Sequence, residues 1–360
     1  MRWNARLGWR TLLAVMVVAL TWELACRVDD WVSYQAPVQS RYGMNILYRD
    51  SPWGPIGNPG ARFGKWRINS EGFRGPEVPA WPDATTVVTY GASETFGMYE
   101  SEGNEFPRRL ENMLNASGGS RFRVLNMALP GMRVGSGAAY LSQVVSRYHA
   151  SIVVMYPTPA HYIGVSRDYC DREVRPLPED WNKGALLRLP ERLSDLIKGS
   201  LPRAVMTRLR HWSIALSQRG KPTLEVVDEA SYRAWEDDLR CAIRAARSAG
   251  AGIPVLVTHA NRFGLKPAKD DMYWLVAWRQ QYSELDEHAF IAHERRSNEI
   301  LRQVARDEGV LLVDAAAAMN GKAGYFQDYA HFTNEGAQAM ARLIHSALIE
   351  RSNPTARHER

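Results

Sequence analysis

Five short apolar runs, rich in β-branched residues, recur along the chain, and segments with helical periodicity separate them. The runs occupy residues 85–90, 122–127, 151–156, 253–258 and 310–313. Strands that are apolar throughout and alternate with helices form parallel sheets that helices cover on both faces. We therefore predict an α/β fold, a three-layer α/β/α sandwich around a five-stranded parallel sheet. Ligands bind such sheets beyond the carboxyl ends of the strands, so chemistry is expected in the loops after these runs.

The predicted helices cover residues 105–114, 231–248, 298–307 and 334–350. In the second of them, Trp235, Leu239 and Ile243 fall on one face, as in a helix packed on a core. The Arg- and Pro-bearing residues 161–225 contain no clear strand, and we interpret them as an insertion or lid. The chain thus divides into an extended lead-in, one main domain and a disordered polar tail, with predicted boundaries at 28–80, 81–350 and 351–360.

The N-terminus predicts a location at a membrane. A basic head with Arg2, Arg6 and Arg10 precedes an uncharged run over residues 11–22. This pattern is typical of a secretory signal peptide or a signal anchor, here over residues 1–27. The cleavage-site pattern is poor, so we expect an uncleaved single-pass anchor with the main domain on the extracytoplasmic, periplasmic side. The alternative is a buried N-terminal helix of a soluble protein.

Charge and cysteine content exclude several classes of function. The net charge of +6 comes from scattered arginines and forms no clustered basic patch, so nucleic-acid binding is not expected. The three cysteines show no ligand spacing with one another or with histidine, so we expect no zinc site. A disulfide between Cys170 and Cys241 is compatible with an oxidising compartment, although sequence alone does not pair them.

Ser93 is the first candidate catalytic residue. It lies two residues after Gly91, where the first strand turns into a helix in the segment GASETFG. Glycine permits a sharp turn there, and backbone N–H groups around such a serine suit an oxyanion. The alternative is an ordinary serine at the N-terminus of a helix.

Asp328 and His331 form the second candidate constellation, in DYAHFT before the last helix. Their D-x-x-H spacing allows one turn to present both side chains, with the carboxylate holding the imidazole in the tautomer that accepts a serine proton. The alternative is a surface loop with an incidental histidine. His259 follows a strand and is a candidate to line the same crevice.

These features resemble the SGNH/GDSL hydrolase family. GASETFG matches its first block, NMALPG over residues 126–131 matches the second, and Asp328 to His331 matches the last. NSEGFR over residues 69–74 is similar to the lead-in of membrane-anchored members. The resemblance covers residues 66–349 and implies a flavodoxin-like, SGNH hydrolase-like domain. It implies that Ser93 is the nucleophile and that the N–H groups of Ser93 and Gly131 form the oxyanion hole.

One departure from the family pattern concerns the oxyanion hole. The third block normally ends in an asparagine that donates to the oxyanion, and Ala160 stands near that position here. Either the two backbone N–H groups suffice, or a nearby side chain substitutes for the asparagine; the candidate pocket residues are Tyr156, Thr158 and His161.

We therefore expect a serine esterase that hydrolyses acyl, and in particular acetyl, esters by a Ser-His-Asp mechanism. This serine chemistry needs no metal or organic cofactor, and we expect none. A predicted envelope location favours an acylated glycan or a related small ester as substrate. The alternatives are an O-acyltransferase that works with a membrane-protein partner, and a catalytically inactive carbohydrate-binding or assembly protein, for which the missing asparagine is the best argument.

Overall fold

The computed structural model describes residues 5–34, 36, 38–39, 43–117, 119–170, 177, 187–264 and 267–352. The predicted tail over 351–360 lies almost wholly outside the described residues, as does part of the predicted insertion over 161–225.

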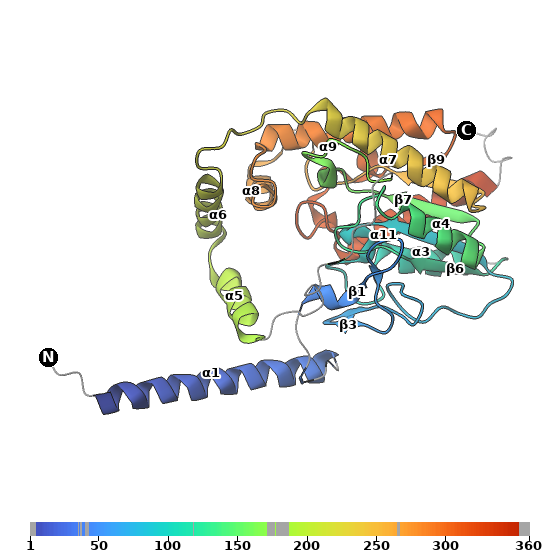
Figure 1. Ribbon diagram of the computed structural model, residues 1–360. Helices are drawn as coiled ribbons and strands as arrows, with labels where there is room; N and C mark the ends of the chain where they lie inside the picture. Colours follow the sequence, from blue (N-terminus) through green and yellow to red (C-terminus); the bar gives the residue numbers. More distant parts are fainter. Residues whose placement is uncertain are drawn as a thin grey trace.

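A five-stranded parallel sheet forms the centre of the molecule (Figure 1). Its strands are β5 (Thr85–Gly91), β6 (Phe122–Asn126), β7 (Ile152–Tyr156), β8 (Ile253–Val257) and β9 (Leu311–Val313). Their order is β6-β5-β7-β8-β9, and every pair is parallel. This is the doubly wound order of flavodoxin-like folds, so the predicted fold class is confirmed. The order reverses at β5, and the carboxyl end of β5 is therefore the expected ligand site.

Helices cover both faces of the sheet. Side chains that alternate along β5 point to opposite faces, so Val88 packs in one hydrophobic core and Val87 in the other. The first core contains residues from α4 (Ala138–Tyr148), α7 (Glu229–Ser248) and α9 (Glu287–Asp307). The second contains residues from α3 (Phe106–Ala116), α10 (Ala315–Met319) and α11 (Asn334–Ser352). Neither α4 nor α10 was predicted, and the predicted start of α9 lies eleven residues too late.

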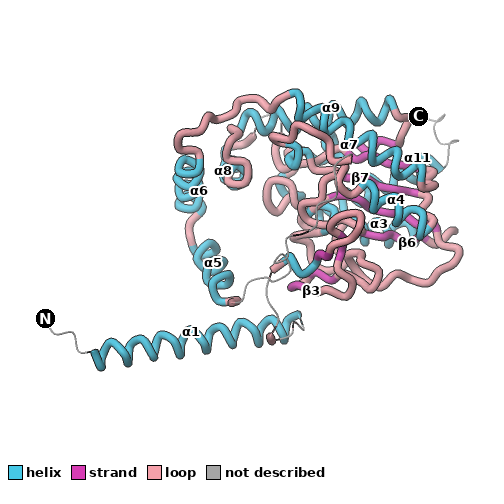
Figure 2. Tube along the Cα trace, viewed as in Figure 1, coloured by secondary structure: helices cyan, strands magenta, loops and turns pink. Residues whose placement is uncertain are grey.

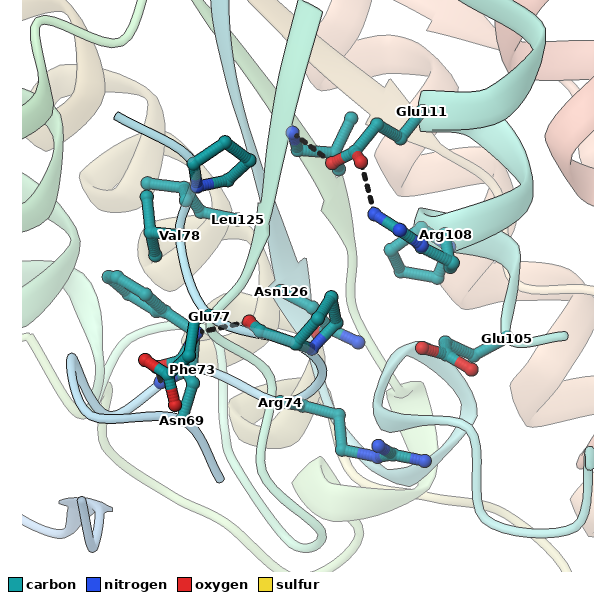
Figure 3. A pocket seen from close by; sticks show the side chains of 14 residues that line it. Asn69, Phe73, Arg74, Glu77, Val78, Glu105, Arg108, Glu111, Leu125 and Asn126 are labelled. Carbon is teal, nitrogen blue, oxygen red and sulfur yellow. Dashed lines mark hydrogen bonds and ion pairs between the residues drawn. The ribbon is translucent and has the colours of Figure 1, made fainter. Parts of the chain in front are cut away.

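The lead-in is packed into the domain. It contains η1 (Met44–Leu47) and two small antiparallel hairpins, β1 (Tyr48–Arg49) with β2 (Ile56–Gly57) and β3 (Arg62–Phe63) with β4 (Trp66–Arg67). Figure 3 shows Asn69, Phe73 and Arg74 beside Leu125 and Asn126 at the end of β6. The Arg74 N–H donates to the Asn126 carbonyl at 2.8 Å, and the Asn69 side chain accepts from the Phe73 N–H at 2.9 Å. The NSEGFR segment thus attaches the lead-in to the edge of the sheet.

A long helix and two shorter helices stand outside the sandwich (Figures 1 and 2). The long helix is α1 (Ala5–Tyr34), and within the described residues Gly8–Tyr34 is the one segment long and apolar enough to cross a membrane. The shorter helices are α5 (Leu189–Ser200) and α6 (Arg203–Ser217), which connect α1 to α8 (Met272–Arg279). The remaining short elements are α2 (Ser93–Phe96), η2 (Pro159–Tyr162), η4 (Lys269–Asp271) and η5 (Ala323–Tyr325).

The segment after η2 is attached to α7 at two points. Cys170 forms a disulfide with Cys241 of α7. One turn away, the buried Asp238 accepts hydrogen bonds from the Tyr162 hydroxyl at 2.5 Å and from the Tyr169 N–H at 2.8 Å. Burial raises the pKa of Asp238 to about 6, although these hydrogen bonds oppose the shift. The disulfide and the carboxylate together fix the start of the predicted insertion.

Candidate active site

Ser93 begins the short helix α2 just beyond the carboxyl end of strand β5, the second strand of the sheet. Gly91, the last residue of β5, has no room for a side chain, because a Cβ atom would approach the carbonyl oxygen of its strand partner Tyr156 to 2.5 Å. A bulkier residue would push β5 and β7 apart. Glycine therefore allows β5 to stay paired with β7 up to its last residue, and the chain then enters α2 with Ser93 at the carboxyl edge of the sheet.

Asp328 and His331 reach Ser93 from the loop that precedes α11. One oxygen of Asp328 accepts the N–H groups of Ala330 at 3.0 Å and His331 at 2.9 Å, which folds the loop into a tight turn. Its other oxygen lies 2.8 Å from Nδ1 of His331. Nε2 of His331 lies 2.9 Å from Oγ of Ser93. Two groups separated by 238 residues in sequence thus lie within hydrogen-bond distance.

The charge state of His331 depends on its neighbours. Burial lowers the pKa of the imidazole, but the hydrogen bond and negative charge of Asp328, together with the charge of Glu94, outweigh it and raise the pKa above its ordinary value. Nδ1–H donates to Asp328, so in the neutral ring the lone pair of Nε2 faces the serine hydroxyl. This arrangement allows the ring to accept the serine proton.

The loop after β6 lies next to the serine loop. The Asn126 side chain donates to the Thr95 carbonyl at 3.0 Å and accepts the Ala128 N–H at 3.2 Å, so one amide joins the two loops. Gly131 has a φ of 79°, in the left-handed region that favours glycine. Within the described part of the chain, no acceptor contacts the N–H of Ser93 or of Gly131.

The candidate replacements for the missing asparagine have other partners. Ala160 is buried and has no polar side-chain atom. The Thr158 hydroxyl donates to Glu94 at 3.0 Å, and the fully buried Tyr156 hydroxyl donates to the Ala260 carbonyl at 3.3 Å. Nδ1 of His161 lies 3.2 Å from the Met132 carbonyl, and burial lowers the pKa of this ring. A neutral His161 that donates through Nδ1 has only a lone pair on Nε2, so it cannot donate to an oxyanion.

A second histidine lies behind the serine, between two carboxylates. Nδ1 of His259 is 2.7 Å from Glu294, and its Nε2 is 3.3 Å from Glu94. The other oxygen of Glu94 accepts the Thr158 hydroxyl and lies 3.4 Å from Oγ of Ser93. The three side chains come from α2, from the loop after β8 and from α9, and all are buried.

This buried network holds two negative charges and one positive charge. Burial alone would lower the pKa of His259, but the charges and hydrogen bonds of Glu294 and Glu94 raise it to about 10. Burial would raise the pKa of Glu94, but its hydrogen bond with His259 and nearby histidine charges hold the pKa well below its usual range. Both shifts favour a charged pair. A carboxylate can only accept, so both ring nitrogens of His259 donate.

His259 was predicted as a pocket residue, whereas Glu94 and Glu294 were not. Glu94 follows Ser93 directly, and an acidic residue in the first turn of a helix is too common to stand out. Glu294 lies on the buried face of α9 together with His293, Ser297 and Asn298. A cluster of polar residues at core-facing positions of a helix is unusual, and it was the available signal. No group of three or more His, Cys, Asp or Glu in the described ranges is placed to hold a metal ion.

Comparison with known proteins gives matches among solved structures. No family model matches the chain. No curated protein matches its sequence. A lipase/acylhydrolase from Enterococcus faecalis is 13% identical with a TM-score of 0.44, over 74% of this chain and 96% of that one. LAE5, an α/β hydrolase enzyme from the metagenome of Lake Arreo, Spain, is 15% identical with a TM-score of 0.43, over the same shares. An acetylxylan esterase from Geobacillus stearothermophilus is 13% identical with a TM-score of 0.42, over 74% of this chain and 96% of that one.

Proposed function

We propose that this protein is a serine ester hydrolase with Ser93 as nucleophile. One observation carries the proposal: Ser93 Oγ lies 2.9 Å from His331 Nε2, and His331 Nδ1 lies 2.8 Å from Asp328. A nucleophile within hydrogen-bond distance of a base that a third group orients is the arrangement of activated serines.

The proposed reaction has two stages. In the first, Ser93 Oγ attacks the acyl carbonyl carbon while His331 Nε2 takes the hydroxyl proton. The same proton then passes to the leaving alcohol, and the acyl group stays on Ser93. In the second stage His331 takes a proton from water, the hydroxide attacks the acyl-enzyme, and Ser93 recovers its proton as the acid leaves. Asp328 keeps the ring in the correct tautomer and stabilises the imidazolium in both stages.

We assign the oxyanion hole to the backbone N–H groups of Ser93 and Gly131. Tyr156 and Thr158 donate elsewhere, and His161 has no proton to offer in its neutral form. Loss of one donor typically costs about 2.7–4 kcal/mol of transition-state stabilisation. We therefore expect an oxyanion hole with two donors to give slower turnover. Activated esters with good leaving groups should be the best substrates.

A membrane location and an acetylated or otherwise acylated glycan substrate belong to the same proposal. The long helix α1 exposes many of its apolar side chains, including Val15, Val18 and Leu20, which lipid would cover. A domain anchored in this way on the extracytoplasmic side would meet envelope glycans. Acetyl is the smallest common acyl group, so acetyl esters are the first substrates to test.

The direct test uses the purified full chain and p-nitrophenyl acetate. Wild-type protein is expected to release p-nitrophenol with a burst, and Ser93→Ala is expected to have no turnover above background. A fluorophosphonate probe should label the wild type and leave Ser93→Ala unlabelled. Ser101→Ala serves as the control, because Ser101 is exposed and lies outside the proposed triad, and its hydroxyl contacts Asn334 rather than a triad residue. Unchanged hydrolysis in folded Ser93→Ala would refute the proposal.

A further inference from the structure

The helices α5 and α6, here called the arm, expose an apolar surface that the domain does not cover. In Figure 1 the arm stands apart from the sandwich and links α1 to α8. An apolar helix face open to water is costly, and one of this length marks an interaction site. The arm belongs to the predicted insertion, whose role the proposed esterase activity does not explain.

The exposed surface of α6 is a continuous stripe. Val205, Leu209, Trp212 and Leu216 follow one another at intervals of four, three and four residues, which places them on one side of the helix. Their exposed fractions run from 40% for Val205 to 67% for Trp212. The opposite side holds Ile214, the one buried residue of α6.

α8 covers that opposite side. Arg210 lies close to Ile214 around the helix, and its guanidinium donates to the Tyr273 carbonyl of α8 at 3.1 Å. The apolar stripe therefore points away from the domain. Intramolecular packing on α8 cannot cover it.

The helix α5 exposes its apolar side chains even more than α6 does. None of its twelve residues is buried, and Leu193, Leu196 and Ile197 are exposed together on one side. A helix of this length is marginal in water without a surface to pack on. The arm therefore needs a partner that covers both helices.

The start of the arm is fixed to α1. The Glu23 side chain of α1 accepts the N–H groups of Arg188 at 2.8 Å and Leu189 at 2.7 Å, and so caps the N-terminus of α5. Arg188 Nε also pairs with Asp30 of α1 at 2.8 Å. Glu23 is the first acidic residue of α1, so the arm begins where the uncharged part of the candidate span ends.

The arm is oriented relative to α1 as a helix pair on a membrane surface would be relative to a membrane-spanning helix. In Figure 1, α5 and α6 run across the direction of α1, at the edge of the molecule toward which the N-terminal half of α1 extends. If that half crosses a bilayer, the arm lies along the surface of that bilayer. Since α8 lies on the domain side of α6, the apolar stripe faces the lipid.

The charge of the arm points to the kind of lipid. Residues 188–221 contain eight Lys or Arg and two Asp or Glu, a local concentration of positive charge that was not expected from arginines scattered along the chain. Two of these arginines, Arg188 and Arg192, pair with Asp30 of α1, and the other basic residues lie along α5, α6 and the turn after α6. Arg208 flanks the stripe at an exposed position. A helix with a hydrophobic face, a tryptophan on it and basic residues beside it is typical of helices that lie in the interface of anionic membranes.

We propose that the arm docks on an anionic membrane surface, with Val205, Leu209, Trp212 and Leu216 in the interface. The inference rests on the proposed anchoring by α1 and adds a second membrane contact. Two contacts fix the orientation of the domain, whereas a single helix would leave it free to rotate. The arm also reaches the active-site loop through α8, because Tyr329, two residues before His331, donates to Gln281 just after that helix at 3.1 Å.

The test places an environment-sensitive NBD label at two neighbouring positions of α6 in the full chain. Cys26→Ser removes the free thiol, and either Trp212→Cys on the stripe or His211→Cys on the polar side provides the labelling site. Each protein is reconstituted into phosphatidylcholine vesicles with or without roughly 30% phosphatidylglycerol. At position 212 we expect a several-fold rise and a blue shift of NBD emission in anionic vesicles, and quenching by brominated lipid. The changes in NBD emission should be much smaller for the label at position 211, and also for the label at position 212 in vesicles without phosphatidylglycerol.

Three results would overturn the proposal, and they are distinguishable. If the protein floats with vesicles but labels at 212 and 211 respond alike, the arm does not touch lipid while α1 still anchors the chain. If the protein does not float at all, the anchoring fails and the inference fails with it. If the label at 212 becomes shielded in detergent as protein concentration rises, a second copy covers the stripe. Hydrolysis of p-nitrophenyl acetate by the same samples reports separately on the proposed activity.

Discussion

Two histidines lie at the same edge of the sheet, each beside a carboxylate, and they differ in what the second ring nitrogen meets. In His331, Nδ1 faces Asp328 and Nε2 faces the Ser93 hydroxyl, which can give up a proton. In His259, Nδ1 faces Glu294 and Nε2 faces Glu94, and neither ionised carboxylate has a proton to give.

Exposure adds to this difference. The His331 side chain is 12% exposed and that of Asp328 14%, while the side chains of His259 and its two partners are exposed by 4% or less. A ring that touches solvent and a hydroxyl can exchange protons during a reaction. A sealed imidazolium between two carboxylates is a fixed charge that holds α2 and the loop after β8 onto α9. Both histidines pair with a carboxylate. The groups around each pair determine whether the ring exchanges protons or carries a fixed charge.

The largest expected effect comes from His331→Gln. Glutamine cannot take the serine proton, so kcat for p-nitrophenyl acetate should fall on the order of 10⁶-fold, the scale seen when the base of such a triad is lost. Stopped-flow and steady-state assays measure the loss. Because the ring is at the surface of the crevice, the midpoint of thermal unfolding should stay close to that of the wild type. Fluorophosphonate labelling that persists in this variant would contradict the assigned role.

Asp328→Asn should have the next largest effect. The asparagine carbonyl can still accept the backbone N–H groups of the turn, but its NH₂ group would face Nδ1 and favour the tautomer with a proton on Nε2. That tautomer cannot accept the Ser93 proton, so kcat should fall on the order of 10⁴-fold with KM little changed. A rise in KM with kcat preserved would show instead that Asp328 binds substrate.

His259→Gln should damage stability more than chemistry. The variant leaves two buried carboxylates with at most one amide donor group, and breaking a buried charge pair typically costs about 3–5 kcal/mol. Urea unfolding measures this loss. His288→Gln, an exposed histidine of the same helix that carries Glu294, is the matched control and should change stability by less than about 0.5 kcal/mol. If His259→Gln instead abolished turnover with stability intact, the contrast between the two histidines would be wrong.

The same variant has a signature in the pH dependence of stability. The folded pKa of His259 is raised to about 10 from an unfolded value of about 6.5. Its contribution is therefore complete below pH ~6.5 and is lost as pH rises toward 10. Wild-type protein should lose stability across this window, and His259→Gln should lose much less.

The sequence predicted the sheet well because buried parallel strands are apolar along their whole length. It predicted α7 for a related reason, since Trp235 and Leu239 follow an apolar period. It missed the first half of α9, where the buried face carries His293, Glu294, Ser297 and Asn298 in place of apolar residues. Periodicity detects a face only when that face is apolar, and here part of the core is a polar network.

The candidate site also has a part that could be predicted from sequence and a part that could not. Ser93, Asp328 and His331 were predicted because strand ends converge at one edge of a parallel sheet, and the structure brings their side chains together; their catalytic role is still a prediction. Glu94, His259 and Glu294 come from three elements, and no local spacing encodes their meeting. Glu94 and His259 are 165 residues apart. Only packing in three dimensions pairs them.

The smallest expected effect is a shift in the pH profile of Glu94→Gln, because Glu94 lies between the two histidines. The negative charge of Glu94 raises the pKa of His331, so Glu94→Gln should shift the acid limb of the pH profile of kcat/KM to lower pH. In the wild type this limb should lie above the ordinary histidine pKa of about 6.5, because the neutral ring is the active form. Glutamine keeps an acceptor for Thr158, and the plateau rate should change by less than about tenfold.

Glu100→Gln provides the matched control for that shift. Glu100 also lies near His331, but burial raises its pKa to about 8, so it is largely neutral below that pH. Removing its carboxyl should therefore move the acid limb less than Glu94→Gln does. Equal shifts in both variants would mean that the limb reports a general loss of negative charge around the crevice, and that Glu94 has no special coupling to the base. A limb that moved only in Glu94→Gln would place the buried network in contact with the chemistry, although none of its charges exchanges a proton there.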